Sequence, residues 1–280
     1  MSLTHNFNTH RGGKILLISL TINVIGLLMA GGLGWHYRGK IADKLGLVAQ
    51  KPSDASLLAF NNEKFEVLND SLIVARCDSS VSILFLGNSL TYCGVADDDP
   101  DKTKRGLTST TIDKDYVHRL VQMISERDSA SVRYSVTNIA EFERQFHLRP
   151  FPWDDKLSDA MVRQPDILIV QIGENVSTDA ITGHREEFID EYARLLERYP
   201  HSRRIITLPF WMDVQKCDAI TEVALRTRSG IADLSHLGHR NSDPRNFAKY
   251  YRHYSNPGFG EHPSDYGFEQ IAKMLLVAIN

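Results

Sequence analysis

The chain has 280 residues, of which 42% are hydrophobic and 24% are charged, so its composition is that of a globular protein and not of a disordered or fibrous one. Its 32 basic and 35 acidic residues give a formal charge of −3, which lacks the basic excess of nucleic-acid-binding proteins. Three cysteines, Cys77, Cys93 and Cys217, are too few and too scattered for a disulfide framework or a cysteine-rich zinc site. At this length we expect one large domain or two small ones.

One segment near the N-terminus departs from this average. Residues 15–35 read ILLISLTINVIGLLMAGGLGW without a charge, and a helix of about 21 residues is roughly 31 Å long, enough to cross a hydrocarbon core. Basic residues flank it, and Trp35 and Tyr37 suit the membrane interface. We predict a tail at 1–14, a transmembrane signal-anchor helix at 15–35, and a single-pass membrane protein whose main domain is extracytoplasmic.

Two alternatives remain open for residues 15–35. A cleaved signal peptide needs a small-residue cleavage site, which the AGG at residues 30–32 matches only loosely. The other alternative is a buried helix of the main domain, although a helix that is apolar all round has little reason to lie at a terminus. Residues 36–80 mix polar and apolar pieces and are interpreted as a stalk and a leading segment, followed by the main domain at 81–280.

From residue 81 onward, apolar runs typical of strands alternate with segments of helical periodicity. The predicted strands are 81–87, 132–136, 166–172, 204–208 and 231–234. The predicted helices are 115–124, 155–162, 185–199, 214–228 and 264–279. This alternation predicts an α/β fold with a doubly wound parallel sheet of five strands and helices on both faces. Ligands of such folds bind at the carboxyl ends of the strands.

Polar turn-forming residues follow two of the predicted strands. GNSL occupies residues 87–90, and a serine at a sharp strand-to-helix turn is exposed at the top of the sheet, where a nucleophile is needed. GEN occupies residues 173–175, and an asparagine amide at a neighbouring strand end can donate a hydrogen bond to a developing oxyanion. Either motif alone is equally consistent with plain turn chemistry.

A third motif, His262-Pro263, comes just before the last predicted helix. A histidine at a loop–helix junction can act as general base for a serine hydroxyl, and Pro263 fits the first turn of a helix. One histidine among 11 is weak evidence by itself. The serine, the Gly-x-Asn and the His-Pro, in this order on an α/β pattern, are much more specific together.

The combination resembles the SGNH hydrolases, also called the GDSL esterase/lipase family, over about residues 80–280. ILFLGNSLTYCG is similar to the nucleophile block of that family, PDILIVQIGENV to its Gly-x-Asn block, and HPSDYGFEQIAKML to its histidine block. The resemblance implies a three-layer α/β/α sandwich, the flavodoxin-like SGNH hydrolase fold. It also implies Ser89 as nucleophile, His262 as base, and the Ser89 backbone N–H and Asn175 amide as oxyanion donors. The supporting residues would be Gly87, Asn88 and Gly173.

The chain departs from the family pattern at the acid that orients the histidine. The family places an aspartate three residues before the histidine, where this chain has Phe259. Glu261 is adjacent to His262, but neighbouring side chains in an extended stretch point apart, so Glu261 is a weak candidate. Either a backbone carbonyl holds the ring, which would make a Ser–His dyad, or an acid from elsewhere does.

A second departure concerns the glycine that the family supplies as a further oxyanion donor. Residues 138–144 read NIAEFER and contain no glycine, so the third donor is not identified. The loss of one donor commonly lowers turnover by about 10²- to 10³-fold. An inactive relative therefore stays among the alternatives.

The resemblance implies a membrane-anchored serine esterase that hydrolyses a small acyl ester, with acetyl expected, through an acyl-enzyme intermediate. A cell-surface polysaccharide would be the alcohol. The alternatives are an O-acyltransferase on the same machinery and a catalytically silent binding module. We expect no cofactor, metal or nucleic-acid partner. A phosphate- or flavin-binding protein is disfavoured because no glycine-rich phosphate loop follows the first strand.

Several other polar and aromatic residues are candidates for a structural or a functional role. Glu174 is interpreted as a solvated or N-capping carboxylate, and the charged loop at 96–105 as a solvated connection, since it lacks the spacing of a calcium loop. Cys93 is expected to be a small buried thiol. The aromatic residues that could line a pocket, with core packing as the alternative, are Phe151, Trp153, Phe210 and Trp211.

Overall fold

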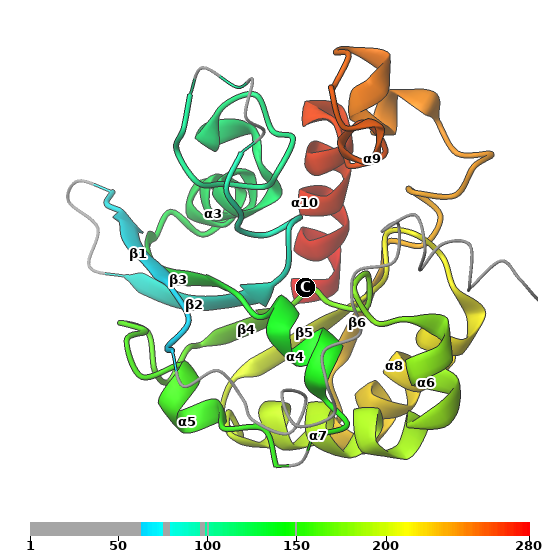
Figure 1. Cartoon of the computed structure of the whole chain (residues 1–280). Coiled ribbons are helices and arrows are strands. Elements are labelled where there is room, and N and C mark those ends of the chain that lie inside the picture. The colour runs from blue at the N-terminus through cyan, green and yellow to red at the C-terminus, as the bar shows by residue number, and fades with distance from the viewer. Residues whose placement is uncertain (1–62, 75–78, 96–98, 100, 149) are drawn as a thin grey trace, which may run out of the picture. The chain divides into compact units, whose positions relative to one another are not determined.

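The computed structural model describes residues 63–74, 79–95, 99, 101–148 and 150–280 (Figure 1). The predicted tail, the 15–35 segment and most of the predicted stalk lie outside the described residues, as does Cys77. Among the described residues, no helix combines the length and the apolar character that crossing a membrane requires. Cys93 and Cys217 are both free and only partly buried.

Six strands form one sheet in the order β1-β3-β2-β4-β5-β6. The strands are β1 (Val67–Leu72), β2 (Ser80–Gly87), β3 (Ser131–Asn138), β4 (Ile167–Val170), β5 (Arg203–Leu208) and β6 (Gly230–Asp233). Strands β2 to β6 are parallel, whereas β1 runs antiparallel to β3. The five predicted parallel strands are confirmed, and the predicted count of five is corrected to six. The sequence of β1, VLNDSL, is mostly exposed at the sheet edge and lacks the apolar run of a buried strand.

Helices cover both faces of the sheet and make three layers (Figure 1). Successive side chains of a strand point to opposite faces, so Leu84 and Leu86 of β2 pack in one apolar cluster, and Ile83 and Phe85 pack in the other. The helices are α3 (Tyr116–Asp128), α4 (Ala140–Gln145), α5 (Trp153–Lys156), α6 (Thr178–Gly183), α7 (Arg185–Glu197), α8 (Val214–Thr227), α9 (Pro257–Gly260) and α10 (Asp265–Ile279). Helices α3 and α10 cover one face, and α7 and α8 cover the other. Three 3₁₀ helices are η1 (Ile112–Lys114), η2 (Pro244–Asn246) and η3 (Ala248–Tyr250).

The predicted helix at 155–162 is wrong, whereas the other four predicted helices correspond to α3, α7, α8 and α10. Helix α5 lies earlier and is shorter. Beyond it, the backbone N–H of Met161 donates to Asn69 Oδ1 at 2.8 Å, and that of Val162 donates to Ser135 Oγ at 2.9 Å. These donors are satisfied by side chains of the sheet, so the carbonyls four residues earlier do not receive them and no helix continues.

The carboxyl ends of the central strands are in register. Gly87 of β2 pairs with Asn138 of β3, Leu86 pairs with Val170 of β4, and Val170 pairs with Ile206 of β5. The chain runs from β2 to β3 on one side and then returns to β4 on the other side of β2. The loops after β2 and β4 therefore meet at a topological switch point, where doubly wound folds bind their ligands.

Candidate active site

The candidate nucleophile Ser89 lies in the tight turn that follows β2 and is partly exposed. The turn needs glycine at residue 87, because a Cβ there would lie 1.7 Å from Thr91 Oγ1. The backbone N–H groups of Thr91 and Tyr92 both donate to the carbonyl of Asn88 at 3.0 Å. These bonds hold the Ser89 side chain at the carboxyl edge of the sheet.

The histidine selected from the sequence comes to the same edge. His262 Nε2 lies 3.2 Å from Ser89 Oγ, and His262 Nδ1 lies 3.0 Å from the carbonyl oxygen of Gly258 in α9. A carbonyl oxygen only accepts hydrogen bonds, so Nδ1 carries the proton and the lone pair of Nε2 faces the serine hydroxyl. This is the tautomer that a general base requires.

Packing around His262 fixes the position of its ring. The indole of Trp211 lies 4.9 Å from it, centroid to centroid, in an edge-to-face arrangement. Trp211 Nε1 in turn donates to the carbonyl of Glu261 at 3.2 Å, and the carbonyl of His262 accepts from Ala248 N at 2.9 Å. Burial lowers the pKa of His262, because it disfavours the charged imidazolium. Of the four aromatic residues weighed, Phe151, Trp153 and Phe210 are buried in the core.

Neither the side chain of Phe259 nor that of Glu261 accepts a hydrogen bond from His262 Nδ1. Both carboxylate oxygens of Glu261 accept hydrogen bonds from Lys249 Nζ at 2.8 Å, so the weak assignment of Glu261 as orienting acid is corrected. Phe259 packs its ring against Tyr254, with centroids 6.5 Å apart. Of the two alternatives, the structure has the backbone carbonyl of Gly258 as the acceptor.

The candidate oxyanion donor Asn175 follows β4 in a loop that needs a glycine. Gly173 has φ +126°, and a Cβ there would lie 2.6 Å from Pro209 Cγ. The Asn175 side chain points its Nδ2 at Glu143 Oε2, 2.7 Å away, and Arg144 approaches its Oδ1 at 3.4 Å. Among the described residues, the backbone N–H of Ser89 has no acceptor.

Glu143 is the residue of this edge that sequence reasoning did not single out. The glycine-free stretch 138–144 forms the end of β3 and most of α4, and the Glu143 side chain is fully buried. Its Oε1 accepts from the backbone N–H of Gly173 at 2.7 Å and of Asn175 at 3.0 Å, and from Asn88 Nδ2 at 3.3 Å. The only signal in the sequence is an acidic residue within the stretch where a glycine was expected.

Glu174 completes this cluster and is not a solvated carboxylate. Its Oε2 accepts from Asn88 Nδ2 at 2.7 Å, and its Oε1 accepts from the backbone N–H of Phe210 at 2.8 Å. Burial raises the pKa of Glu174. Burial and the neighbouring charge of Glu174 raise the pKa of Glu143 to about 7, because two carboxylates in one buried site resist double ionisation.

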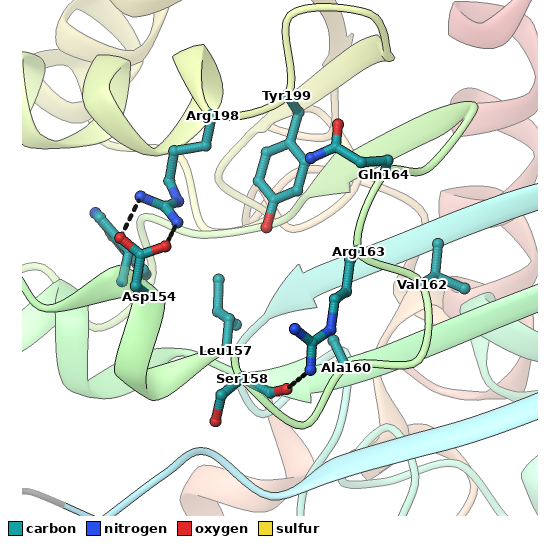
Figure 2. Close-up of a pocket in the computed structure, with 10 residues that line it drawn as sticks. Asp154, Leu157, Ser158, Ala160, Val162, Arg163, Gln164, Arg198 and Tyr199 are labelled. Carbon is teal, nitrogen blue, oxygen red and sulfur yellow. Dashed lines mark hydrogen bonds and ion pairs between the residues drawn. The ribbon is translucent and has the colours of Figure 1, made fainter.

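No cluster of three or more histidine, cysteine, aspartate or glutamate side chains suited to a metal is found among the described residues. Within the charged 96–105 loop, residues 102–104 are exposed as expected for a solvated connection, whereas the buried Arg105 pairs with the buried Asp99 at 3.0 Å. A cavity of about 200 Å³ is lined by Trp153, Leu157 and Tyr199 (Figure 2). The residues that line this cavity precede β4 and β5 in the chain, so it lies at the amino ends of these strands, opposite to the edge that carries Ser89.

Comparison with known proteins yields structural similarities alone. No family model and no curated protein matches the chain. The chain is similar to a carbohydrate esterase family 2 enzyme from Corynascus thermopiles (Myceliophthora fergusii) at 13% identity, covering 71% of this chain and 65% of that one, with a TM-score of 0.46. It is also similar to a protein described as a GDSL-like lipase from Parabacteroides merdae, at 18% identity, coverage of 72% and 96%, and a TM-score of 0.46.

A third similar structure is a two-domain esterase active on acetylated mannans, at 12% identity and a TM-score of 0.48. The similarity covers 72% of this chain and 49% of that chain. The chain thus spans about half of the mannan esterase and just under two thirds of the family 2 enzyme. At such identities the substrate of a similar structure does not carry over to this chain.

Proposed function

We propose that the chain is a serine ester hydrolase of the SGNH type, with Ser89 as nucleophile and His262 as general base. The single observation that carries this proposal is the chain of contacts from Ser89 Oγ to His262 Nε2, and from His262 Nδ1 to the Gly258 carbonyl. A nucleophile within hydrogen-bond reach of a base, itself oriented by a third group, is the signature of nucleophilic catalysis. The Asn175 amide and the free N–H of Ser89 would donate to the oxyanion.

The reaction follows from these positions. Ser89 Oγ attacks the ester carbonyl carbon while its proton passes to His262 Nε2, and the tetrahedral oxyanion receives hydrogen bonds from Ser89 N and Asn175 Nδ2. Breakage of the ester C–O bond releases the alcohol, which takes the proton back from His262. Water then attacks the acyl-enzyme while His262 takes its proton, and His262 returns this proton to Ser89 Oγ as the bond to the acyl group breaks and the acid leaves. The Gly258 carbonyl stabilises the imidazolium at each stage.

We propose an acetyl ester on a glycan as the substrate. A cavity of about 330 Å³ begins at Trp211, the residue that packs on His262, and continues past Arg240 and Tyr250. Aromatic faces beside polar side chains suit a sugar ring better than a long acyl chain. The membrane anchor at 15–35 and the extracytoplasmic position of the catalytic domain are proposals that rest on the sequence alone.

The test is acetate release by the full-length chain in detergent, first from p-nitrophenyl acetate and then from acetylated polysaccharides. Release of free acetate supports the hydrolase. Transfer of the acetyl group to an added glycan acceptor, in place of release to water, would make the chain an O-acyltransferase on the same machinery. Absence of both reactions, with no covalent labelling of Ser89, would make it a silent binding module.

Replacement of the oxyanion donor gives a graded prediction. Asn175→Ala is expected to lower kcat for p-nitrophenyl acetate by about 10²- to 10³-fold with little change in KM, because the amide acts on charge that develops in the transition state. Steady-state kinetics measure both parameters. Asn280→Ala, at an exposed asparagine that follows the far end of α10 from His262, is the control. A loss confined to KM would contradict the assigned role of Asn175.

The pH dependence of kcat/KM reports the protonation state of His262. His262 accepts a proton only when it is neutral, and burial lowers its pKa below the usual value of about 6.5. The neutral form therefore persists to lower pH than in an exposed histidine. We expect kcat/KM to stay level from neutral pH to below about 6.5, and then to fall about tenfold per pH unit. An acid limb centred above about 6.5 would contradict this environment of His262.

A further inference from the structure

The buried carboxylate of Glu143 has more donors than a structural role in α4 requires. It accepts four hydrogen bonds, and the donors are Gly173 N, Asn175 N, Asn175 Nδ2 and Asn88 Nδ2. Three of these come from the loop after β4, which carries the candidate oxyanion donor. The fourth comes from the residue directly before Ser89. The Glu143 side chain therefore links the loop after β2 to the loop after β4, which together carry Ser89 and Asn175.

The contact with Asn175 fixes which way its amide faces. Amide oxygen and nitrogen are similar in shape, and the hydrogen-bond partners decide their orientation. Glu143 Oε2 lies 2.7 Å from Nδ2, and Arg144 Nη2 lies 3.4 Å from Oδ1. The Glu143 carboxylate accepts a hydrogen bond at this point, so the donor Nδ2 of Asn175, and not the acceptor Oδ1, must face it. The second hydrogen on Nδ2 has no acceptor among the described residues and stays available for an oxyanion.

We propose that Glu143 is a positioning residue that holds the Asn175 amide in its oxyanion-donating orientation. This inference rests on the proposed esterase function. The family pattern supplies a further backbone donor from a glycine after the strand that corresponds to β3. In this chain the same stretch supplies an acceptor, which organises the donors already present and adds none.

Glu174 explains how a carboxylate is tolerated beside a developing negative charge. Asn88 Nδ2 bridges Glu143 and Glu174, at 3.3 Å and 2.7 Å. Burial raises the pKa of both carboxyl groups, and the charge of Glu174 raises the pKa of Glu143 further, so the doubly ionised state of the pair is disfavoured. The four donors to Glu143 further spread the remaining charge.

The Glu143→Gln variant keeps the shape of the side chain at residue 143 but changes the group that orients the Asn175 amide. The new amide keeps an oxygen for the two backbone N–H groups, but its NH₂ faces Asn175 Nδ2, and two donors cannot pair. The Asn175 amide is then expected to turn over and to present Oδ1 where the oxyanion forms. We expect kcat for p-nitrophenyl acetate to fall about 10- to 100-fold, KM to stay within about twofold, and phosphonylation of Ser89 by a fluorophosphonate to slow in parallel.

The matched control is Glu191→Gln. Glu191 is another buried carboxylate, which accepts from the backbone N–H of Phe151 at 3.2 Å, but it lies on α7 away from the site. The Glu191→Gln variant measures how the neutralisation of a buried glutamate that does not contact Asn175 affects kcat. We expect its kcat to match the wild type. Glu143→Asp, which keeps the charge but is too short to reach Asn175 Nδ2, is measured alongside in case Glu143→Gln fails to fold, and is expected to lose at least about tenfold in kcat.

A double-mutant cycle distinguishes positioning from general support of the fold. In an Asn175→Ala background there is no amide to orient, so Glu143→Gln is expected to lower the phosphonylation rate by less than about threefold further. Independent losses that multiply, or a Glu143→Gln variant with wild-type kcat, would overturn the inference. Wild-type chain that neither hydrolyses the ester nor reacts with the probe would overturn the proposed function itself, and the inference with it.

Discussion

Ser89→Ala is expected to lower the hydrolysis of p-nitrophenyl acetate by about 10⁴- to 10⁶-fold and to leave the fold intact. The alanine has no oxygen for the carbonyl carbon, so no acyl-enzyme forms, and only the residual catalysis of binding and the oxyanion donors remains. Ser89 is a partly exposed turn residue whose side chain contacts His262, so its loss removes little packing. Rates measured with the full-length chain, corrected for spontaneous hydrolysis, test this prediction.

The control for this variant is Ser80→Ala. Ser80 lies on the same strand, β2, but at its exposed amino end, away from the catalytic edge. Wild-type rates are expected for Ser80→Ala, and circular dichroism spectra of both variants should match the wild type. Equal rates for Ser89→Ala and the wild type would place the activity elsewhere in the chain and would remove the basis of the proposed mechanism.

His262→Ala is expected to produce a loss of similar size to Ser89→Ala, about 10⁴-fold or more, because the serine hydroxyl then has no base at 3.2 Å. The two residues act as a unit, so the double variant should be no slower than either single variant. Steady-state rates of the three variants measure this coupling. His236→Ala, at an exposed histidine, is the control. A double variant that is far slower than both single variants would mean that Ser89 and His262 act independently.

The size of the His262 effect also bears on the absence of an orienting acid. The Gly258 carbonyl at 3.0 Å fixes the ring and its tautomer, which is what the base needs to function. It lacks the full negative charge with which a carboxylate would stabilise the imidazolium. The candidate site thus pairs Ser89 with His262 and a neutral acceptor, and burial lowers the pKa of the His262 ring.

The sequence predicted the parallel part of the sheet well, and for a clear physical reason. Buried strands such as β2 and β4 are continuous apolar runs, because both faces of a parallel sheet are covered by helices. The edge strand β1 was not predicted because an exposed edge places little demand on side-chain polarity. Helix α4, with only six residues, is too short for a periodicity to be recognised.

The candidate site was predictable where side chains carry the chemistry. Ser89, Asn175 and His262 were each selected from a strand or helix end, and the register of β2 and β4 brings the first two together. A backbone carbonyl was one of the two expected acceptors for His262 Nδ1. Which residue supplies it could not be predicted, because any residue at position 258 has a carbonyl. Glu143 was missed because its importance depends on where α4 places it, beneath the loop after β4.

Covalent labelling shows whether Ser89 is a nucleophile that His262 activates. The full-length chain is treated with a fluorophosphonate, digested and analysed by mass spectrometry. We predict one adduct, on the peptide that contains Ser89, which is absent from Ser89→Ala and forms far more slowly in His262→Ala. No adduct on the folded wild-type chain, or an adduct on a different residue, would contradict the account.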